Sequence, residues 1–199
     1  MVRVADDVSD VETFLELEAL AVAPYASFVH TDEAEARRVA RRLLEEGVAE
    51  FAPPAGFGVV TDDGALVAMV AGPLVPAELT RSRLRATRII MKLVGPDTIA
   101  RMKIAGETLL KLDAGDAYLS RIAVVPGRRR QGIARFALDA FLSRARAREA
   151  KRAVLEVGAD EASAIALYRS AGFDAVDERR VVTPDGRRTL AYVHMTLPL

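Results

Sequence analysis

The segment AYLSRIAVVPGRRRQGIARFALDA, residues 117–140, runs from an apolar stretch through a short basic turn into a helical pattern. Apolar and β-branched residues predict one strand over residues 117–125, and Pro126 ends it. After the turn, apolar residues recur at helical spacing from Ile133 to about Glu149. A buried strand and an amphipathic helix joined by so short a turn pack as layers, so this segment indicates an α/β fold.

The residues that follow continue the alternation of strand and helix. RAVLEVG, residues 152–158, predicts another strand, and a helix is expected after it, capped by Asp160 and ended by Gly172. Two further strands are expected on either side of the turn at residues 184–186. The second half of the chain is therefore expected to form a β–turn–α–β–α core completed by two strands.

The first half predicts a short strand at residues 2–5 and two helices. Ser9 is expected to cap the first helix, and the second runs from Asp32, its cap, to Gly47. Residues 56–72 contain two apolar runs joined at Asp63-Gly64, which is typical of a β-hairpin.

Residues 73–115 predict a helical insertion between the third and fourth strands. Two helical patterns are broken at Gly95-Pro96, and the second carries Ile99, Met102, Leu109 and Leu112 at helical spacing. The apolar stripe of the insertion is expected to be buried against the rest of the domain, a second subunit in a homodimer, or an apolar acceptor. The first pattern also carries five basic residues, Arg81, Arg83, Arg85, Arg88 and Lys92. Such a cluster can bind a membrane surface, but it more commonly lies on a solvated helix face.

The composition fits one domain, residues 1–199. Hydrophobic residues make up 51% of the chain, and 28 basic side chains balance 28 acidic ones, so a dedicated nucleic-acid binder is not expected. No cysteine is present, which excludes disulfides and thiolate metal sites. The two histidines, His30 and His194, are isolated and expected to be structural, so no metal is expected. No signal peptide and no apolar run of ~18–20 residues is found, so a cytoplasmic protein without a membrane contact is expected.

The turn after residue 125 is a candidate anion site. A strand that feeds directly into a helix leaves backbone N–H groups pointing outward at the helix N-terminus, where they can bind phosphate. Gly132 and Ala134 would let a ligand approach the backbone, and Arg128, Arg129 and Arg130 add positive charge. Solvated arginines on an ordinary loop explain the same residues, so the turn alone leaves both interpretations open.

A longer pattern separates these interpretations. Arg129-x-x-Gly132-x-Ala134 after an apolar strand resembles the acyl-CoA motif of the GCN5-related N-acetyltransferases, abbreviated GNAT. LEVGADEASAIALYRSAGF, residues 155–173, resembles the later strand and helix of the same family. The resemblance covers about residues 117–173 and implies a mixed, mostly antiparallel sheet flanked by helices. Within the family these motifs most resemble those of the ribosomal-protein alanine N-terminal acetyltransferases, although the insertion is larger than the one those compact enzymes carry.

The resemblance implies two catalytic residues. Glu156 matches the family's base, and Tyr168 matches the acid that protonates the departing thiolate. A carboxylate on the solvent face of a strand and a tyrosine packed on the core are the alternative explanations. Glu161 stands where the family usually has asparagine, so either it turns outward or a contact to the cofactor is lost. The residues implied in binding acetyl-CoA, the first three through their backbone, are Ile122, Ala123, Val124, Arg129, Arg130, Gln131, Gly132, Ile133, Ala134, Arg135 and Glu161.

The function implied is acetyl-CoA-dependent transfer of an acetyl group to a primary amine, by direct attack of the amine on the thioester. An acyl-CoA-binding regulatory or partner domain with little turnover is the alternative, which Glu161 and the insertion keep open. The acceptor, a small molecule or a protein amine, does not follow from the sequence. The insertion is expected to form a lid or wall beside it.

Overall fold

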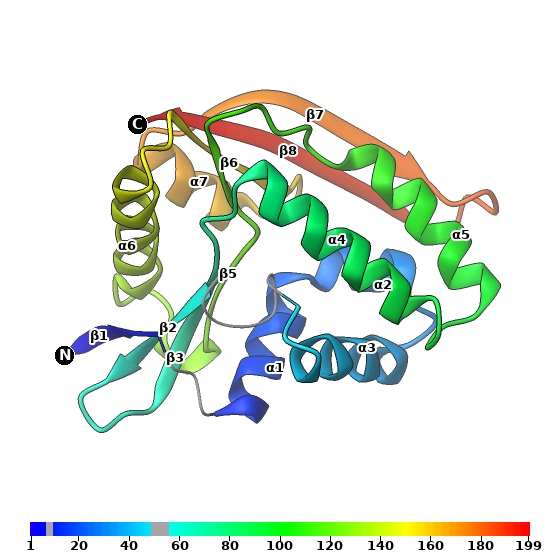
Figure 1. The fold of residues 1–199 in the computed structure, drawn as a ribbon, viewed down its shortest axis with the longest axis horizontal. Helices are drawn as coiled ribbons and strands as arrows, with labels where there is room; N and C mark the ends of the chain where they lie inside the picture. The colour runs from blue at the N-terminus through cyan, green and yellow to red at the C-terminus, as the bar shows by residue number, and fades with distance from the viewer. Residues whose placement is uncertain (7–9, 49–55) are drawn as a thin grey trace.

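The computed structural model describes residues 1–6, 10–48 and 56–199 (Figure 1). Their strands form two four-stranded sheets, one in the order β1-β2-β3-β5 and the other in the order β4-β6-β8-β7. All strand pairs within the sheets are antiparallel except β4 with β6, so the mostly antiparallel sheet is confirmed. The strand bounds are β1 Val2–Ala5, β2 Gly56–Thr61, β3 Leu66–Ala71, β4 Asp116–Leu119, β5 Arg121–Val124, β6 Arg152–Gly158, β7 Asp174–Val182 and β8 Thr189–Pro198.

The prediction of one continuous strand over residues 117–125 is wrong, because the strand breaks at Ser120 into β4 and β5. β4 pairs in parallel with β6 as far as Leu119 and Leu155. β5 leaves that partner and pairs antiparallel with β3 instead. β6 runs on to Gly158 beside β8, so the two sheets separate beyond Leu155. The sheets therefore diverge at the fourth and fifth strands of the chain.

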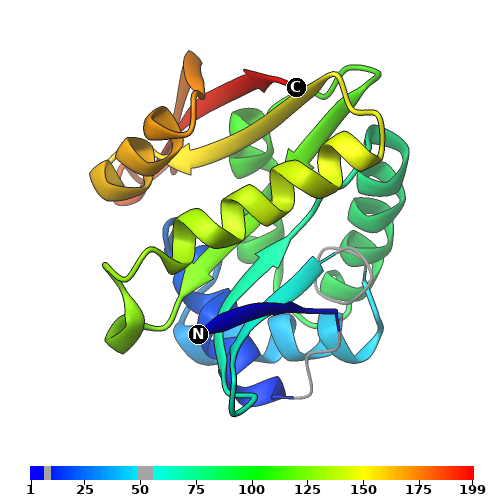
Figure 2. The same cartoon turned by 90° about the vertical axis from the view of Figure 1, so that its left-hand side faces the viewer.

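Helices cover both faces of the sheets. α6 (Ile133–Ala147) packs on β3 and β5 from one side, and α1 (Val11–Ala21) packs on the same strands from the other. Figure 2 shows α6 crossing in front of the strands, with α1 behind them. α7 (Ala162–Ser170) joins α6 in the largest apolar cluster, where Phe141, Tyr168 and Phe173 are buried. No helix in the described part of the chain is long and apolar enough to span a membrane.

The hairpin and the capped second helix of the first half are confirmed. β2 and β3 are joined through Gly64, which has a φ of 87°. α3 (Glu33–Glu45) begins after Asp32, whose side chain accepts a hydrogen bond from Glu35 N at 2.8 Å. α1 is capped by Asp10, and Ser9 lies outside the described residues. α2 (Ala23–Val29) was not predicted, because its seven residues are too few to give a clear period.

The insertion lies between β3 and β4 and consists of α4 (Pro76–Ile90) and α5 (Pro96–Ala105), broken at Gly95-Pro96 as predicted. Its second helix is shorter than expected: after a 3-10 turn at Gly106–Thr108, Leu109 and Leu112 lie outside it. The apolar faces of α4 and α3 meet in one cluster that contains Val39, Leu43 and Ile90. The domain itself therefore covers the stripe on α4.

A buried polar network fastens the insertion to the core. Glu35 of α3 is only 7% exposed, and its carboxylate lies 2.9 Å from His30 Nδ1 and accepts a hydrogen bond from Thr98 Oγ1 of α5, also at 2.9 Å. Thr31 Oγ1 donates to its second oxygen at 3.0 Å. Arg101 of α5 adds a bond to Val29 O at 2.6 Å. These contacts join α2, α3 and α5.

We expect Glu35→Gln to destabilise the protein by about 1–3 kcal/mol at neutral pH, the cost of leaving buried donors without their acceptor. Burial alone would raise the pKa of Glu35, but hydrogen bonds from His30, Thr98 and Thr31 outweigh it and lower this pKa below its ordinary value of 4.5. The lowered pKa stabilises the fold above pH 4.5, and this contribution is lost as the pH falls through the folded-state pKa.

Urea unfolding of wild type and Glu35→Gln at several pH values between 7 and 3 measures this difference. Glu33→Gln is the control, because Glu33 is an exposed acid in the first turn of the same helix. A difference between wild type and Glu35→Gln that stays constant down to pH 3 would contradict the assigned role of the charged carboxylate.

Candidate active site

The separation of the sheets opens a cavity of about 410 Å³ between β5 and the end of β6. Val125 N donates to Val67 O of β3 at 3.0 Å. Because backbone polar groups alternate sides along a strand, those of Val124 and Ile122 face away from β3. Both residues line the cavity, so one wall of it is a strand edge with backbone groups directed toward its interior.

The basic turn forms the end of this cavity next to α6. Gly132 caps α6 with a φ of 79°, and Arg130 before it has a φ of 61°. The first backbone bond of the helix runs from Phe136 N to Gly132 O at 3.0 Å, so the N–H groups of residues 133–135 have no acceptor within the helix. Glycine is favoured at position 132 because its φ is positive, a left-handed conformation that other residues rarely adopt. The predicted anion site thus has the expected backbone geometry.

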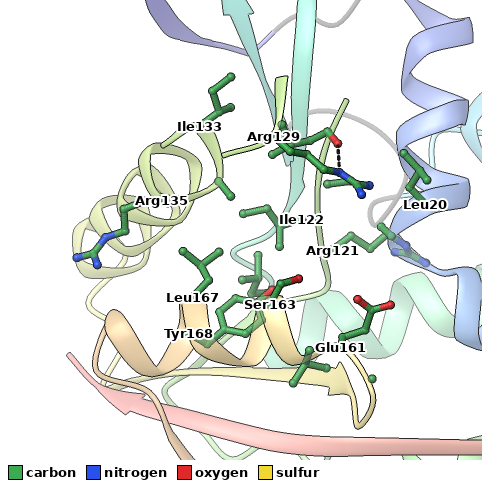
Figure 3. A pocket seen from close by; sticks show the side chains of 18 of the residues that line it. Leu20, Arg121, Ile122, Arg129, Ile133, Arg135, Glu161, Ser163, Leu167 and Tyr168 are labelled. Carbon is green, nitrogen blue, oxygen red and sulfur yellow. Dashed lines mark hydrogen bonds between the residues drawn. The ribbon is translucent and has the colours of Figure 1, made fainter. Parts of the chain in front are cut away.

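All of the eleven residues expected to bind acetyl-CoA except Gln131 line this cavity. The Gln131 amide instead lies 3.5 Å from Gly127 O. Arg129 Nε donates to Val124 O at 3.3 Å, so this arginine also holds the end of β5 (Figure 3). Arg135 lines the cavity, but its guanidinium points away from it and pairs with Asp139 at 2.9 Å. Its N–H group, rather than its charge, is therefore available at the helix N-terminus.

Glu161 and Tyr168 lie on the α7 side of the cavity. The prediction that Asp160 caps this helix is wrong, because Glu161 stands at the N-cap position of α7 and makes no side-chain capping bond. Glu161 belongs to the cavity lining. Tyr168 is 5% exposed, lines the same cavity and meets Phe173 edge to face, with the ring centroids 5.8 Å apart. Burial raises the pKa of Tyr168 above its ordinary value of 10.0, so its phenol is protonated at neutral pH. Tyr168 thus both packs on the core and reaches the cavity.

Glu156 lies at the point where the sheets separate. It is the first residue of β6 beyond the pairing with β4, and it is partly buried. One carboxylate oxygen accepts a hydrogen bond from Leu110 N of the segment that ends the insertion. The other accepts from Tyr118 Oη at 2.9 Å. The carboxylate is therefore held in place by the insertion and by β4, and it is not on an open face.

A second cavity of about 320 Å³ adjoins the first. It lies beneath the insertion and is lined by residues of α1 and α2 as well as α3, α4 and α5. The residues that line both cavities mark their junction and surround the break in the strand: Ala21, Ser120, Arg121, Glu156 and Tyr192. The insertion was expected to lie beside the acceptor site, and it forms a wall of this second cavity.

Several residues of the junction were missed in the sequence. Arg121 Nε lies 2.8 Å from Glu18 of α1, which is only 2% exposed. A charged residue within an apolar strand and an acid on the apolar stripe of a helix are signals that could have identified this pair. All four tyrosines of the chain line one or both cavities: Tyr25, Tyr118, Tyr168 and Tyr192. A tyrosine ring packs against apolar neighbours while its hydroxyl can still form hydrogen bonds.

Residues 14–173 match the acetyltransferase (GNAT) family. The ribosomal protein bS18-alanine N-acetyltransferase of Escherichia coli K12 is 36% identical over 99 residues, which are 49% of this chain and 66% of that protein, slightly under two thirds. The crystal structure of the ribosomal-protein-S18-alanine N-acetyltransferase from Escherichia coli is 20% identical and superposes with a TM-score of 0.54 over 100% of this chain and 94% of that one.

An N-acetyltransferase from Staphylococcus aureus Mu50 is 12% identical and superposes with a TM-score of 0.70 over 98% of this chain and 100% of that one. A Bacillus subtilis acetyltransferase, solved in complex with CoA, is also 12% identical, with a TM-score of 0.59 over 100% of this chain and 99% of that one. The chain belongs to the GNAT family of acetyltransferases.

Proposed function

We propose that the protein transfers an acetyl group from acetyl-CoA to a primary amine by direct attack of the amine on the thioester. The observation that carries this proposal is the junction of the two cavities. One cavity presents a strand edge and a helix N-terminus, and the other opens beneath the insertion. Glu156 lines both, so a carboxylate stands where two substrates that enter from opposite sides would meet.

The first cavity fits acetyl-CoA. Phosphates suit the N-terminus of α6, where unpaired N–H groups and Arg129 and Arg130 lie close to Gly132. The amides of the pantetheine arm suit the free edge of β5, because an extended chain can pair with an exposed strand edge. The position of Glu161 in the lining is the one mismatch, since an ionised carboxylate accepts hydrogen bonds and repels phosphate.

The residues at the junction have complementary roles in the transfer. Acetyl-CoA supplies the activated acyl group. Glu156 accepts a proton from the attacking amine, directly or through a water molecule, and an N–H group of β5 donates to the thioester oxygen. Tyr168 donates its proton to the departing sulfur. Since a buried phenol is a weak acid, we expect this donation to accompany the growth of negative charge on sulfur.

The activity is tested by incubating the protein with acetyl-CoA and a panel of amines while the release of CoA thiol is followed. We expect thiol release that depends on an added amine, and Glu156→Gln to lower kcat by about 100-fold or more, as for a lost general base. Calorimetry checks that acetyl-CoA still binds the variant. Binding of acetyl-CoA without amine-dependent thiol release by wild type would identify a binding domain rather than an enzyme.

The apolar stripe of α4 packs on α3, so the proposal requires no second subunit.

A further inference from the structure

The second cavity is walled mainly by apolar side chains. Val39 and Leu43 of α3 pack with Ala86 and Ile90 of α4, and Met102 of α5 also lines the cavity. Val39 and Leu43 are almost fully buried, so they belong to a packed wall rather than to a loose surface. The shape of the cavity is therefore set by the packing of the insertion on α3.

Polar side chains in this lining already have partners in the protein. Thr87 Oγ1 donates to the backbone of its own helix at 2.8 Å. His30 Nδ1 lies 2.9 Å from Glu35, and Arg121 Nε lies 2.8 Å from Glu18. Arg83 of α4 lies over the Tyr118 ring, with its guanidinium carbon 5.7 Å from the ring centroid. Apart from Arg83 and Thr87, the residues of α3 and α4 that line the cavity are apolar.

The acidic groups are confined to the junction. Among the described residues that line the second cavity, the carboxylates are those of Glu18 and Glu156. Glu18 pairs with Arg121, so Glu156 is the acid that can receive an ammonium group. A polyamine would have to place a further charge against the apolar wall, and burying an unpaired charge is costly.

The volume limits the occupant as well. At about 320 Å³ the cavity lies near the lower end of the ~300–1,000 Å³ range of ligand sites. An extended peptide placed between α3 and α4 would bury backbone N–H and C=O groups against apolar side chains, where they lose their hydrogen bonds to water. A compact molecule without further polar groups avoids this cost.

We propose that the second cavity selects a small primary amine with a compact apolar body, aliphatic or aromatic, as the acetyl acceptor. This inference rests on the acetyl transfer proposed above. The amino group lies at the junction beside Glu156, and the apolar body lies between Leu43 of α3 and Ile90 of α4.

Three probes distinguish the acceptor classes: phenethylamine, spermidine and a hexapeptide with an N-terminal alanine. We expect kcat/KM for phenethylamine to exceed that for each of the others by about tenfold or more, the discrimination that an apolar pocket provides. A higher kcat/KM for spermidine or for the peptide would overturn the proposal.

Two substitutions link the preference to the cavity. Ala86→Phe fills it from α4 and is expected to lower kcat/KM for phenethylamine by about tenfold or more. Ala77→Phe is the matched control, because Ala77 is an exposed residue of the same helix outside the lining. Ile90→Ala enlarges the cavity and is expected to improve the use of a bulkier amine, 2-(1-naphthyl)ethylamine, relative to phenethylamine. Equal effects of Ala86→Phe and Ala77→Phe, with Ile90→Ala unchanged, would show that the cavity does not select the acceptor.

Calorimetry separates failure of this inference from failure of the proposed function. Phenethylamine is titrated into the complex of the protein with CoA, and acetyl-CoA into each variant. If no amine is acetylated but phenethylamine binds and Ala86→Phe weakens that binding, the cavity assignment holds and the proposed function fails. If another amine is acetylated and phenethylamine does not bind, the enzyme stands and the acceptor class proposed for it is wrong.

Discussion

Gly132→Glu should abolish measurable binding of acetyl-CoA, with a loss of affinity of at least about 100-fold. Gly132 caps α6 in a left-handed conformation with a φ of 79°, and apart from the adjacent residues nothing described lies within 4 Å of the place where a Cβ would stand. A glutamate side chain can therefore occupy the space in front of the helix N-terminus. Its carboxylate would take the place of a phosphate and repel those nearby, and such like-charge contacts cost several kcal/mol. Calorimetric titration with acetyl-CoA measures the loss.

Two control variants separate charge, bulk and backbone strain at this position. Gly132→Gln has the same length and the same unfavourable φ without the charge, so it should retain more affinity. Gly127→Glu places the charge elsewhere in the same turn, outside the cavity lining, and should change the affinity little. If folded Gly132→Glu binds acetyl-CoA as wild type does, the anion site at the start of α6 is misassigned.

Tyr168→Phe should lower kcat by roughly 10- to 1000-fold, the range for loss of a general acid. The ring keeps its edge contact with Phe173 and its place in the core, so affinity for acetyl-CoA and thermal stability should stay close to those of wild type. Steady-state kinetics with saturating acetyl-CoA and calorimetry give the two quantities separately.

A purely structural tyrosine predicts a different pattern. In that case Tyr168→Phe would lower the melting temperature or acetyl-CoA affinity, and kcat per folded molecule would stay at the wild-type value. Wild-type kcat in a folded variant removes Tyr168 from the mechanism, and the proton for the departing sulfur then has to come from water or from another group.

The first cavity could be predicted from the sequence because one continuous stretch builds most of it. Residues 119–135 contribute the strand edge, the basic turn and the start of α6, and local spacing carries that information. The break at Ser120 could not be predicted in the same way. β4 and β5 are both apolar and both extended, and what divides them is the choice of different partners, β6 and β3. Strand pairing is a long-range property that composition within the strand does not encode.

The second cavity could not be predicted from the sequence for a related reason. Most of its apolar wall comes from α3 and from the insertion, which are more than 30 residues apart in the chain. Neither segment alone shows which of its residues stay uncovered. The two hydrogen bonds to the Glu156 carboxylate could not be predicted either, because Leu110 and Tyr118 belong to other parts of the chain. Resemblance identified Glu156 and Tyr168 as candidates, but their partners depend on tertiary packing.

The segment that ends the insertion makes contacts with three strands. Leu110 N bonds to Glu156 of β6, Arg179 of β7 donates to Leu109 O at 3.1 Å, and His194 Nε2 of β8 lies 2.7 Å from Thr108 O. We therefore expect substitutions of cavity-lining residues in α4 and α5 to change the proposed acceptor preference, while residues 108–110 keep the Glu156 carboxylate in place. The preference for an acceptor and the position of the proposed base would then depend on separate parts of the insertion.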